Sequence, residues 1–220
     1  MLWLGVMIAC SGPSNIGFDG RVMDSYFPLD GLRSWTYSSQ DPSIPYKVVG
    51  VLNPEGVSVE EGTDAVHTID FTTECIGTAE CTPGPFRVRN LQVSSNRSKG
   101  IRLHGAEDEV AGVIAYDPPV VLAGATGVVG DTSTTTSGGV TFVSTFIEEV
   151  DCPVLVTDEW GDGCVHLTLD DGGAGTPLAG SYWLVPGYAM AAFHWSGDPV
   201  NSAGADLIWR LLDTTFEEEQ

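Results

Sequence analysis

Short runs in which apolar and polar residues alternate recur along the whole chain, and this alternation is typical of β-strands with one buried face. The 27 glycines and 13 prolines lie between runs of Val, Ile, Thr, Phe and Tyr, where they indicate turns. No long stretch shows the 3.6-residue apolar period of a helix. The pattern predicts an all-β, mostly antiparallel domain, closed as a sandwich or an open barrel. The candidate strands are 33–38, 46–52, 65–73, 86–93, 101–104, 110–116, 140–150, 152–157, 164–169, 181–185 and 190–195, with a strand or short helix at 207–212.

The charge of the chain limits its partners. Its 30 acidic and 9 basic residues give a formal net charge of −21, and such a surface repels the phosphates of nucleic acids and of anionic lipids. Nucleic-acid binding is therefore not expected. High charge can also indicate disorder, but 42% hydrophobic residues and six tryptophans indicate a folded chain. A length of 220 residues is enough for one domain with a substantial core.

Two segments about 99 positions apart are similar to each other. EGTDAVHTIDF at 61–71 and WGDGCVHLTLDD at 160–171 each contain a glycine, then Val-His, then alternating residues. A looser match relates Leu29-Asp30-Gly31 to the glycine-rich segment 123–130. The spacing indicates a two-fold duplication of one β-meander unit.

An apolar run, LWLGVMIA, ends at Cys10. Its eight residues are far fewer than the roughly 20 that span a bilayer as a helix, and they match the apolar region of a signal peptide. The stretch Met7-Ile8-Ala9-Cys10 resembles a bacterial lipobox, which implies removal of a signal peptide (1–9) and attachment of diacylglycerol and an acyl chain such as palmitate to Cys10. Met7 stands where lipoboxes usually have Leu, and no Lys or Arg precedes the run. The alternatives are an ordinary cleaved signal or a buried first strand.

The lipobox resemblance also divides the chain and gives it a location. Residues 10–22 are expected to form a lipid-anchored tether, residues 23–213 a single all-β domain, and residues 214–220 an acidic tail. The expected location is the bacterial cell envelope, at the outer membrane or the cell surface. The membrane is then a partner through the lipid anchor.

Four cysteines remain besides Cys10. An even number in an exported chain suggests two disulfides, and local pairing would join Cys75 to Cys81 and Cys152 to Cys164. Each bond would close a small loop and contribute roughly 2–3 kcal/mol in the chain-entropy model. The alternative is a four-cysteine zinc site, which requires short C-x2-C knuckles, whereas the spacings here are C-x5-C and C-x11-C. Disulfides are therefore the prediction.

Three further motifs resemble those of a broad, largely uncharacterised group of bacterial exported lipoproteins. SYFPLDGLRSWTY at 25–37 is similar to the pattern YFPL-x-x-G-x-x-W-x-Y that begins their mature domains, with three residues rather than two between Gly31 and Trp35. YDPPVVL at 116–122 and GSYWLVPGYAMAAF at 180–193 resemble later landmarks, with Ala189 where the group has a glycine. The resemblance implies an exported β-rich domain and brings no catalytic residues with it.

Motifs of common enzyme classes do not occur in the sequence, which contains no G-x-S-x-G, H-E-x-x-H or G-x-G-x-x-G. The segment GATGVVGDTS at 124–133 has Asp131 where a phosphate-binding loop needs lysine, so a connecting loop is expected there. Carboxylates in two further loops, Asp158, Asp162, Asp170 and Asp171, could bind Ca²⁺, but Asp-Gly turns arise without a metal and are the preferred interpretation.

The four histidines have different expected environments. His67 shares its parity with Ile69 and is expected in the core, whereas His104, His166 and His194 lie opposite apolar partners on their strands. A zinc site built from these last three with a carboxylate, or a Ser-His-Asp triad, is an alternative without specific support. No catalytic residue, metal ion or cofactor is predicted.

The most distinctive charge feature is a basic segment. Five of the nine basic residues fall between positions 86 and 104, where there is no Asp or Glu; they are Arg87, Arg89, Arg97, Lys99 and Arg102. Pairing of 86–93 with 101–104 across the turn SSNRSKG would place them on one hairpin. They are a candidate contact for an anion, such as a lipid phosphate, a cell-wall polymer or an acidic partner. The alternative is a solvated face that pairs with nearby carboxylates.

These observations favour a cell-envelope lipoprotein whose β-domain has a non-catalytic structural or binding role. The aromatic pairs Trp35/Tyr37 and Phe193/Trp195 each fall on one strand face and are expected in the core. A pocket lined by them would instead make the protein a carrier of a small apolar ligand, which is the first alternative. An envelope hydrolase is the second alternative.

Overall fold

The computed structural model describes residues 21–59, 65–77, 86–150, 164–196 and 208–217. These residues form β-strands and one 3-10 turn, η1 (Met23–Tyr26), so the all-β prediction is confirmed. In the same residues, no helix is long and apolar enough to cross a membrane.

Twelve strands form a single antiparallel sheet in the order β7-β6-β5-β4-β3-β2-β14-β13-β12-β11-β10-β9. A separate short ladder joins β1 (Arg21–Val22) to β8 (Thr126–Gly127). The strands of the large sheet are β2 (Leu32–Ser39), β3 (Tyr46–Val59), β4 (Ala65–Cys75), β5 (Val88–Asn96), β6 (Gly100–Asp108), β7 (Gly112–Ala123), β9 (Thr132–Ser137), β10 (Val140–Val150), β11 (Cys164–Asp170), β12 (Gly180–Val185), β13 (Ala189–Trp195) and β14 (Trp209–Glu217).

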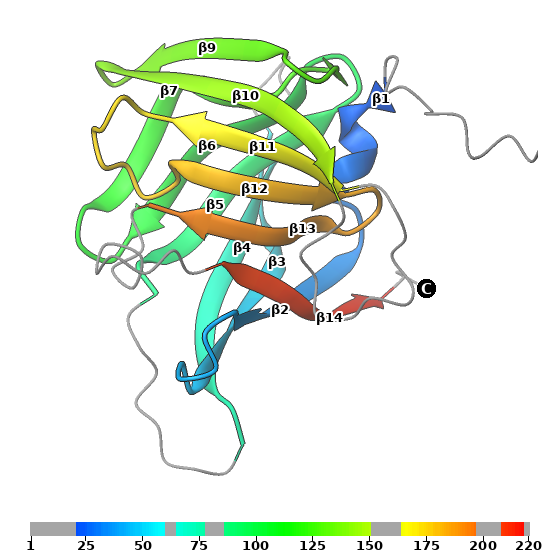
Figure 1. Ribbon diagram of the computed structural model, residues 1–220, viewed down its shortest axis with the longest axis vertical. Helices are drawn as coiled ribbons and strands as arrows, with labels where there is room; N and C mark the ends of the chain where they lie inside the picture. The colour runs from blue at the N-terminus through cyan, green and yellow to red at the C-terminus, as the bar shows by residue number, and fades with distance from the viewer. Residues whose placement is uncertain (1–20, 60–64, 78–85, 151–163, 197–207, 218–220) are drawn as a thin grey trace, which may run out of the picture.

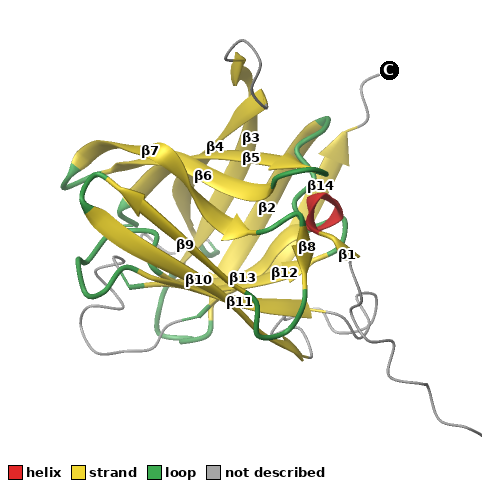
Figure 2. Cartoon of the chain, turned by 90° about the horizontal axis from the view of Figure 1, so that it is seen from above, coloured by secondary structure: helices red, strands yellow, loops and turns green. Residues whose placement is uncertain are grey.

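The large sheet consists of two meanders. Strands β2 to β7 follow one another along the sheet, β9 to β14 do the same, and the β2–β14 pair joins the two sets. The meanders lie face to face as two layers (Figures 1 and 2). The Val-His pairs of the two similar segments, Val66-His67 and Val165-His166, lie on β4 and β11, the third strand of each meander. The organisation into two meander halves expected from the sequence is therefore present in the fold.

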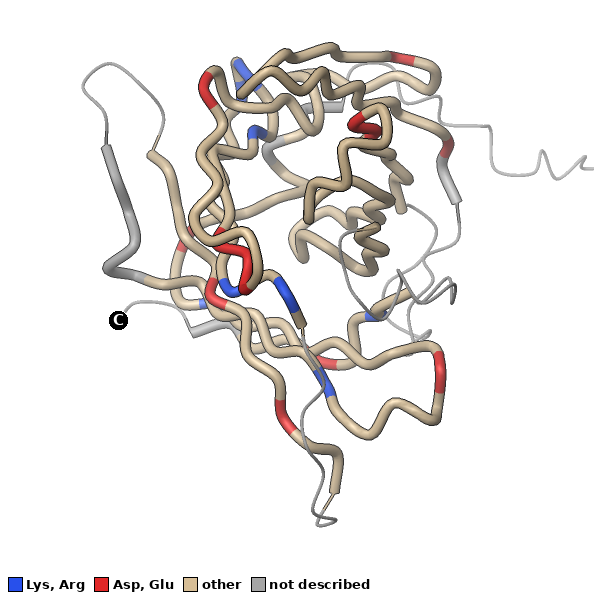
Figure 3. Tube along the Cα trace, turned by 90° about the vertical axis from the view of Figure 1, so that its left-hand side faces the viewer, with Lys and Arg blue, Asp and Glu red and all other residues tan. Residues whose placement is uncertain are grey.

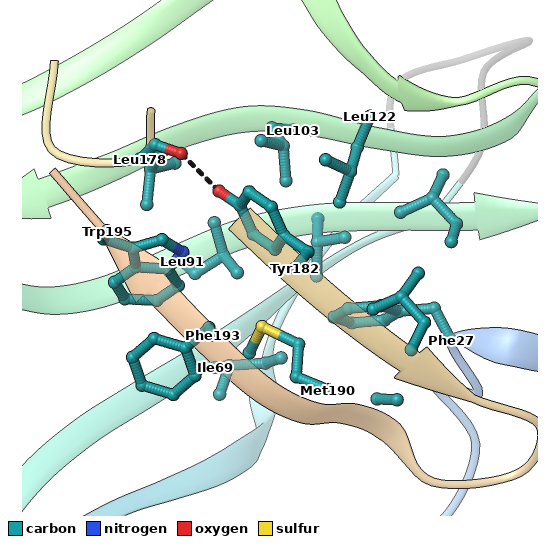
Figure 4. Packing of buried hydrophobic residues seen from close by; sticks show 14 of the residues in the cluster. Phe27, Ile69, Leu91, Leu103, Leu122, Leu178, Tyr182, Met190, Phe193 and Trp195 are labelled. Carbon is teal, nitrogen blue, oxygen red and sulfur yellow. Dashed lines mark hydrogen bonds between the residues drawn. The ribbon is translucent and has the colours of Figure 1, made fainter. Parts of the chain in front are cut away.

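One contiguous hydrophobic cluster fills the space between the layers (Figure 4). Strand alternation directs Trp35 and Tyr37 of β2, and Phe193 and Trp195 of β13, into this cluster, where all four are fully buried. Their expected core role is confirmed. The buried hydroxyl of Tyr182 donates to the backbone carbonyl of Leu178 at 2.5 Å, as the close-up shows.

Several boundaries differ from those expected. β7 continues through Pro118 and Pro119, with a cis peptide bond between Asp117 and Pro118. Both prolines lie in a register irregularity of the edge strand, between Ala115 and Val120, where no ladder partner on β6 needs their missing N–H groups. β14 continues to Glu217 opposite Leu32, so residues 214–217 belong to the sheet and not to an acidic tail. β1 and β9 were not expected as strands, and the candidate strand 152–157 lies outside the described residues.

Candidate functional site

The basic hairpin predicted from the sequence is present. β5 pairs with β6, and the register runs from Val88 opposite Asp108 to Asn96 opposite Gly100 at the turn. Arg102 is half-buried on β6, and its chain neighbours Ile101 and Leu103 are buried on the opposite face of the strand. The hairpin does not, however, gather its cations into one patch.

At one end of the hairpin the arginines are paired with carboxylates. A guanidinium nitrogen of Arg87 lies 2.9 Å from the fully buried carboxylate of Asp108, and Arg89 lies 2.8 Å from Glu109. Burial alone would raise the pKa of Asp108, but hydrogen bonds from Arg87 and from the N–H groups of Ala111 and Val110 outweigh burial and hold the pKa below its usual value. The carboxylate therefore fixes the β6–β7 turn, and these two arginines have the carboxylate-paired role that was the alternative.

The remaining cations lie at the other end of the hairpin. Arg97 is exposed and Lys99 is half-buried in the β5–β6 turn, which the side chain of Asn96 organises by accepting the N–H groups of Ser98 and Lys99 at 2.9 and 2.8 Å. From Val88 to Asn96 the strand covers roughly 27 Å at the usual rise per residue. Basic positions accordingly appear in separate groups among many acidic ones (Figure 3). A single anion site containing all five cations is therefore not formed.

The histidines are not brought together. His104 lies on β6 and shares a 2.8 Å hydrogen bond with the hydroxyl of Ser94, whereas His166 and His194 lie on β11 and β13 in the other meander. The zinc site considered from these three is therefore wrong. The core position expected for His67 is also wrong, because the residue is half-buried. The alternation of buried and exposed side chains shifts in β4, opposite an irregularity in the register of β3.

His166 has a distinctive contact on the outer surface. Its ring stacks on the indole of Trp183 from the neighbouring strand, with centroids 4.5 Å apart and planes inclined by 7°. Burial lowers the pKa of His166, and the charge of Glu148 opposes this. The neutral ring is therefore favoured.

The acidic loop after β11 is held together by hydrogen bonds. The carboxylate of Asp171 accepts the N–H groups of Gly173 and Ala174 on one oxygen, and the N–H and hydroxyl of Thr176 on the other. Asp170 accepts the N–H of Gly172. These are the turn roles preferred for Asp170 and Asp171, whereas Asp158 and Asp162 lie outside the described residues.

The most unusual feature of the fold is the seam between β7 and β9, the two ends of the sheet order. These strands lie side by side without a backbone ladder between them. Side-chain hydroxyls connect the layers there: Thr135 accepts the N–H of Val121 at 3.3 Å, and Ser144 of β10 donates to the carbonyl of Leu122. This role could not be predicted from the sequence, because TSTTTS carries no apolar alternation and its partners lie elsewhere in the chain.

A cavity of about 110 Å³ opens beside this seam. Its lining combines the apolar residues Leu122, Phe146 and Leu167 with the polar residues Ser144 and Asp131. Sites that enclose drug-sized ligands are usually about 300–1,000 Å³. The cavity is therefore suited to a very small molecule or a few waters.

The cysteine predictions fall mostly outside the described residues. Cys75 at the end of β4 and Cys164 at the start of β11 are each disulfide-bonded. Cys81, Cys152 and the predicted lipidation site Cys10 lie outside the described residues, so the pairings and the anchor stay predictions.

Comparison of the chain with protein-family models, with curated proteins and with solved structures found no match. The resemblance of segments 25–37, 116–122 and 180–193 to exported lipoproteins therefore stays a prediction based on those residues.

Proposed function

We propose that this chain is a bacterial cell-envelope lipoprotein, in which a lipid on Cys10 anchors a non-catalytic β-domain with a structural or binding role. The observation that carries the proposal is the apolar run that ends in Met7-Ile8-Ala9-Cys10. The predicted disulfides Cys75–Cys81 and Cys152–Cys164 suit an oxidising envelope compartment. The location proposed is the outer membrane or the cell surface.

A role through the surface of the domain is favoured over one through its interior. The space between the layers is occupied by a contiguous cluster that includes Trp35, Trp195 and Trp209, all fully buried. The cavity at the seam, about 110 Å³, is small for an acyl chain or a sugar. These features support a filled scaffold that presents its outer surface to an envelope component or an acidic partner.

Carriage of a small apolar ligand is the second candidate, and the seam cavity is the observation in its favour. A ligand that enters there would meet Leu122, Phe146 and Leu167. Native mass spectrometry of the protein extracted from membranes distinguishes the two. A co-purified small molecule that is lost in a Leu167→Trp variant supports the carrier, and its absence from wild type supports the scaffold. A hydrolase is the weakest alternative, since no nucleophile motif occurs in the sequence.

Acyl labelling of cells tests the anchor. Wild type is expected to incorporate labelled palmitate and to fractionate with membranes, and Cys10→Ala is expected to lose both properties. Ser11→Ala is the matched control, because it alters the neighbouring residue and leaves the thiol in place. Equal labelling of wild type and Cys10→Ala would show that the lipid is not on this cysteine and would overturn the proposal.

A further inference from the structure

The N-terminal part of the chain enters the domain at one particular end, called here the entry end. It comprises β1, η1, the loop 124–131 and the β5–β6 turn 97–99. β1 pairs with β8 in this loop, and the N–H of Met23 donates to the carbonyl of Ala125 at 3.1 Å. Whatever is attached ahead of residue 21 therefore leaves the domain beside this loop.

The loop at the entry end exposes two adjacent apolar side chains. Val128 is 44% exposed and Val129 is 49% exposed. The turn that carries them is fixed by hydrogen bonds: Asp131 accepts the N–H of Val128 at 3.0 Å on its carboxylate and donates its own N–H to the carbonyl of Val128 at 2.9 Å. Gly130 donates to the carbonyl of Phe146 at 2.8 Å. The valines are thus held outward by a tight turn that is attached to β10.

The turn that carries two basic residues approaches the start of this loop. The turn with Arg97 and Lys99 leads into Gly100, where an added Cβ would lie 2.2 Å from the carbonyl oxygen of Ala123. This close approach places the β5–β6 turn against the start of the loop 124–131. Exposed aliphatic side chains and basic ones at the same end of a domain match the boundary between acyl chains and phosphate groups at a lipid surface.

We propose that the entry end lies on a zwitterionic phospholipid surface, with Val128 and Val129 at the boundary of headgroups and acyl chains and with Arg97 and Lys99 near lipid phosphates. This rests on the proposed function, because a lipid on Cys10 supplies the attachment. The ten residues 11–20 reach at most about 35 Å when extended, so the anchor holds this end near the bilayer and makes a weak contact effective. The net charge of −21 excludes a strongly anionic surface as the preferred partner.

The opposite end of the domain serves as an internal comparison. Val110 in the β6–β7 turn and Val113 at the start of β7 are 79% and 78% exposed, which is more than either valine at the entry end. They lie next to Glu107 and Glu109, and the arginines at this end, Arg87 and Arg89, are already paired with Asp108 and Glu109 and are not available to lipid phosphates. Apolar exposure alone would therefore favour the β6–β7 turn as the lipid contact. The basic residues of the β5–β6 turn and the position of the N-terminal segment favour the entry end.

The test uses the lipidated full-length mature protein on phosphatidylcholine–phosphatidylethanolamine vesicles, followed by hydrogen exchange. Amides of 126–131 are expected to exchange roughly tenfold more slowly on vesicles than in detergent-free solution of a Cys10→Ala chain, a factor equal to about 1.4 kcal/mol. Amides of 109–113 are expected to be unchanged. Val128→Asp with Val129→Asp should remove the protection, and the matched pair Val110→Asp with Val113→Asp should leave it intact.

The anchor on Cys10 and the lipid-facing entry end can be told apart by the outcome of this test. If the wild-type protein is not recovered with the vesicles, the proposed anchor is wrong, and the proposed lipid-facing end is wrong with it. If the protein is recovered with the vesicles, three results would overturn the lipid-facing end alone. They are no protection of the amides of 126–131, protection of 109–113 instead, and protection of 126–131 that survives the Val128/Val129 substitutions. All four substituted valines are exposed, so the variants are expected to fold.

Discussion

Removing the hydroxyls at the β7–β9 seam tests how the two meanders are held closed. In place of a ladder, Ser144 donates to the carbonyl of Leu122 and Thr135 accepts the N–H of Val121. The perturbation is the double substitution Ser144→Ala and Thr135→Val, which keeps the volume nearly constant and deletes both hydrogen bonds. We expect a measurable loss of stability without a change of fold.

The magnitude follows from burial at the two positions. A lost intramolecular hydrogen bond costs about 1 kcal/mol, and a buried carbonyl left without a donor costs about 1–3 kcal/mol. Leu122 is fully buried, so Ser144→Ala incurs the second penalty, whereas Val121 is half-buried and water can replace the Thr135 hydroxyl. The double variant is expected to lose roughly 2–4 kcal/mol, which lowers Tm by on the order of 10 °C in a domain of this size.

The assay is equilibrium unfolding in urea with the disulfides intact, compared with Thr134→Val as a matched control. Thr134 is exposed on the same strand, and surface substitutions of this kind usually change stability by less than about 0.5 kcal/mol. A double variant within that range of wild type, or a control that costs as much as the double variant, would refute closure by these hydroxyls.

Three further predictions concern local features of the fold. Gly100→Ala should cost far more stability than Gly112→Ala, because both glycines have φ near +77° (78 and 76) but only a Cβ at 100 collides with a backbone carbonyl; equal costs in urea would contradict the contact. Burial would raise the pKa of Asp171, but hydrogen bonds from its turn lower it, so its stabilisation is present above the unfolded value of 3.8 and is lost as the pH falls through the lower folded value. Asp171→Asn should therefore be less stable than wild type at neutral pH and approach it well below 3.8, and a constant difference would be the contrary result. Burial lowers the pKa of His166, so the neutral ring is favoured and its stabilisation is lost as the pH falls below the usual 6.5. Protonation should also quench the stacked Trp183, and an emission change that persists in His166→Gln would show another origin.

Much of the strand content could be predicted, because one face of each strand is buried and period-two alternation records that burial. The expected strands at 164–169 and 181–185 agree closely with β11 (Cys164–Asp170) and β12 (Gly180–Val185). β9 was missed because Thr and Ser fill both of its faces. His67 was misplaced because a bulge in the neighbouring strand reverses the alternation, and a bulge depends on pairing between strands.

The sites were less predictable, since they depend on contacts between distant residues. The run of basic residues was evident, but the carboxylates that neutralise Arg87 and Arg89 come from the far end of the neighbouring strand and the turn that follows it. The seam joins Ser144 to Leu122 across two strands that are not neighbours in the sheet order. The separation of the basic residues into two groups follows from the length of the hairpin, which the composition of the segment does not reveal.

The intact mass of the native protein extracted from membranes, measured before and after reduction, tests the central claim most directly. The account predicts a chain that begins at Cys10 and carries a diacylglycerol and acyl adduct, with a gain of about two mass units per disulfide on reduction, for two disulfides. A protein without a lipid adduct, or one that begins elsewhere than Cys10, would contradict the account.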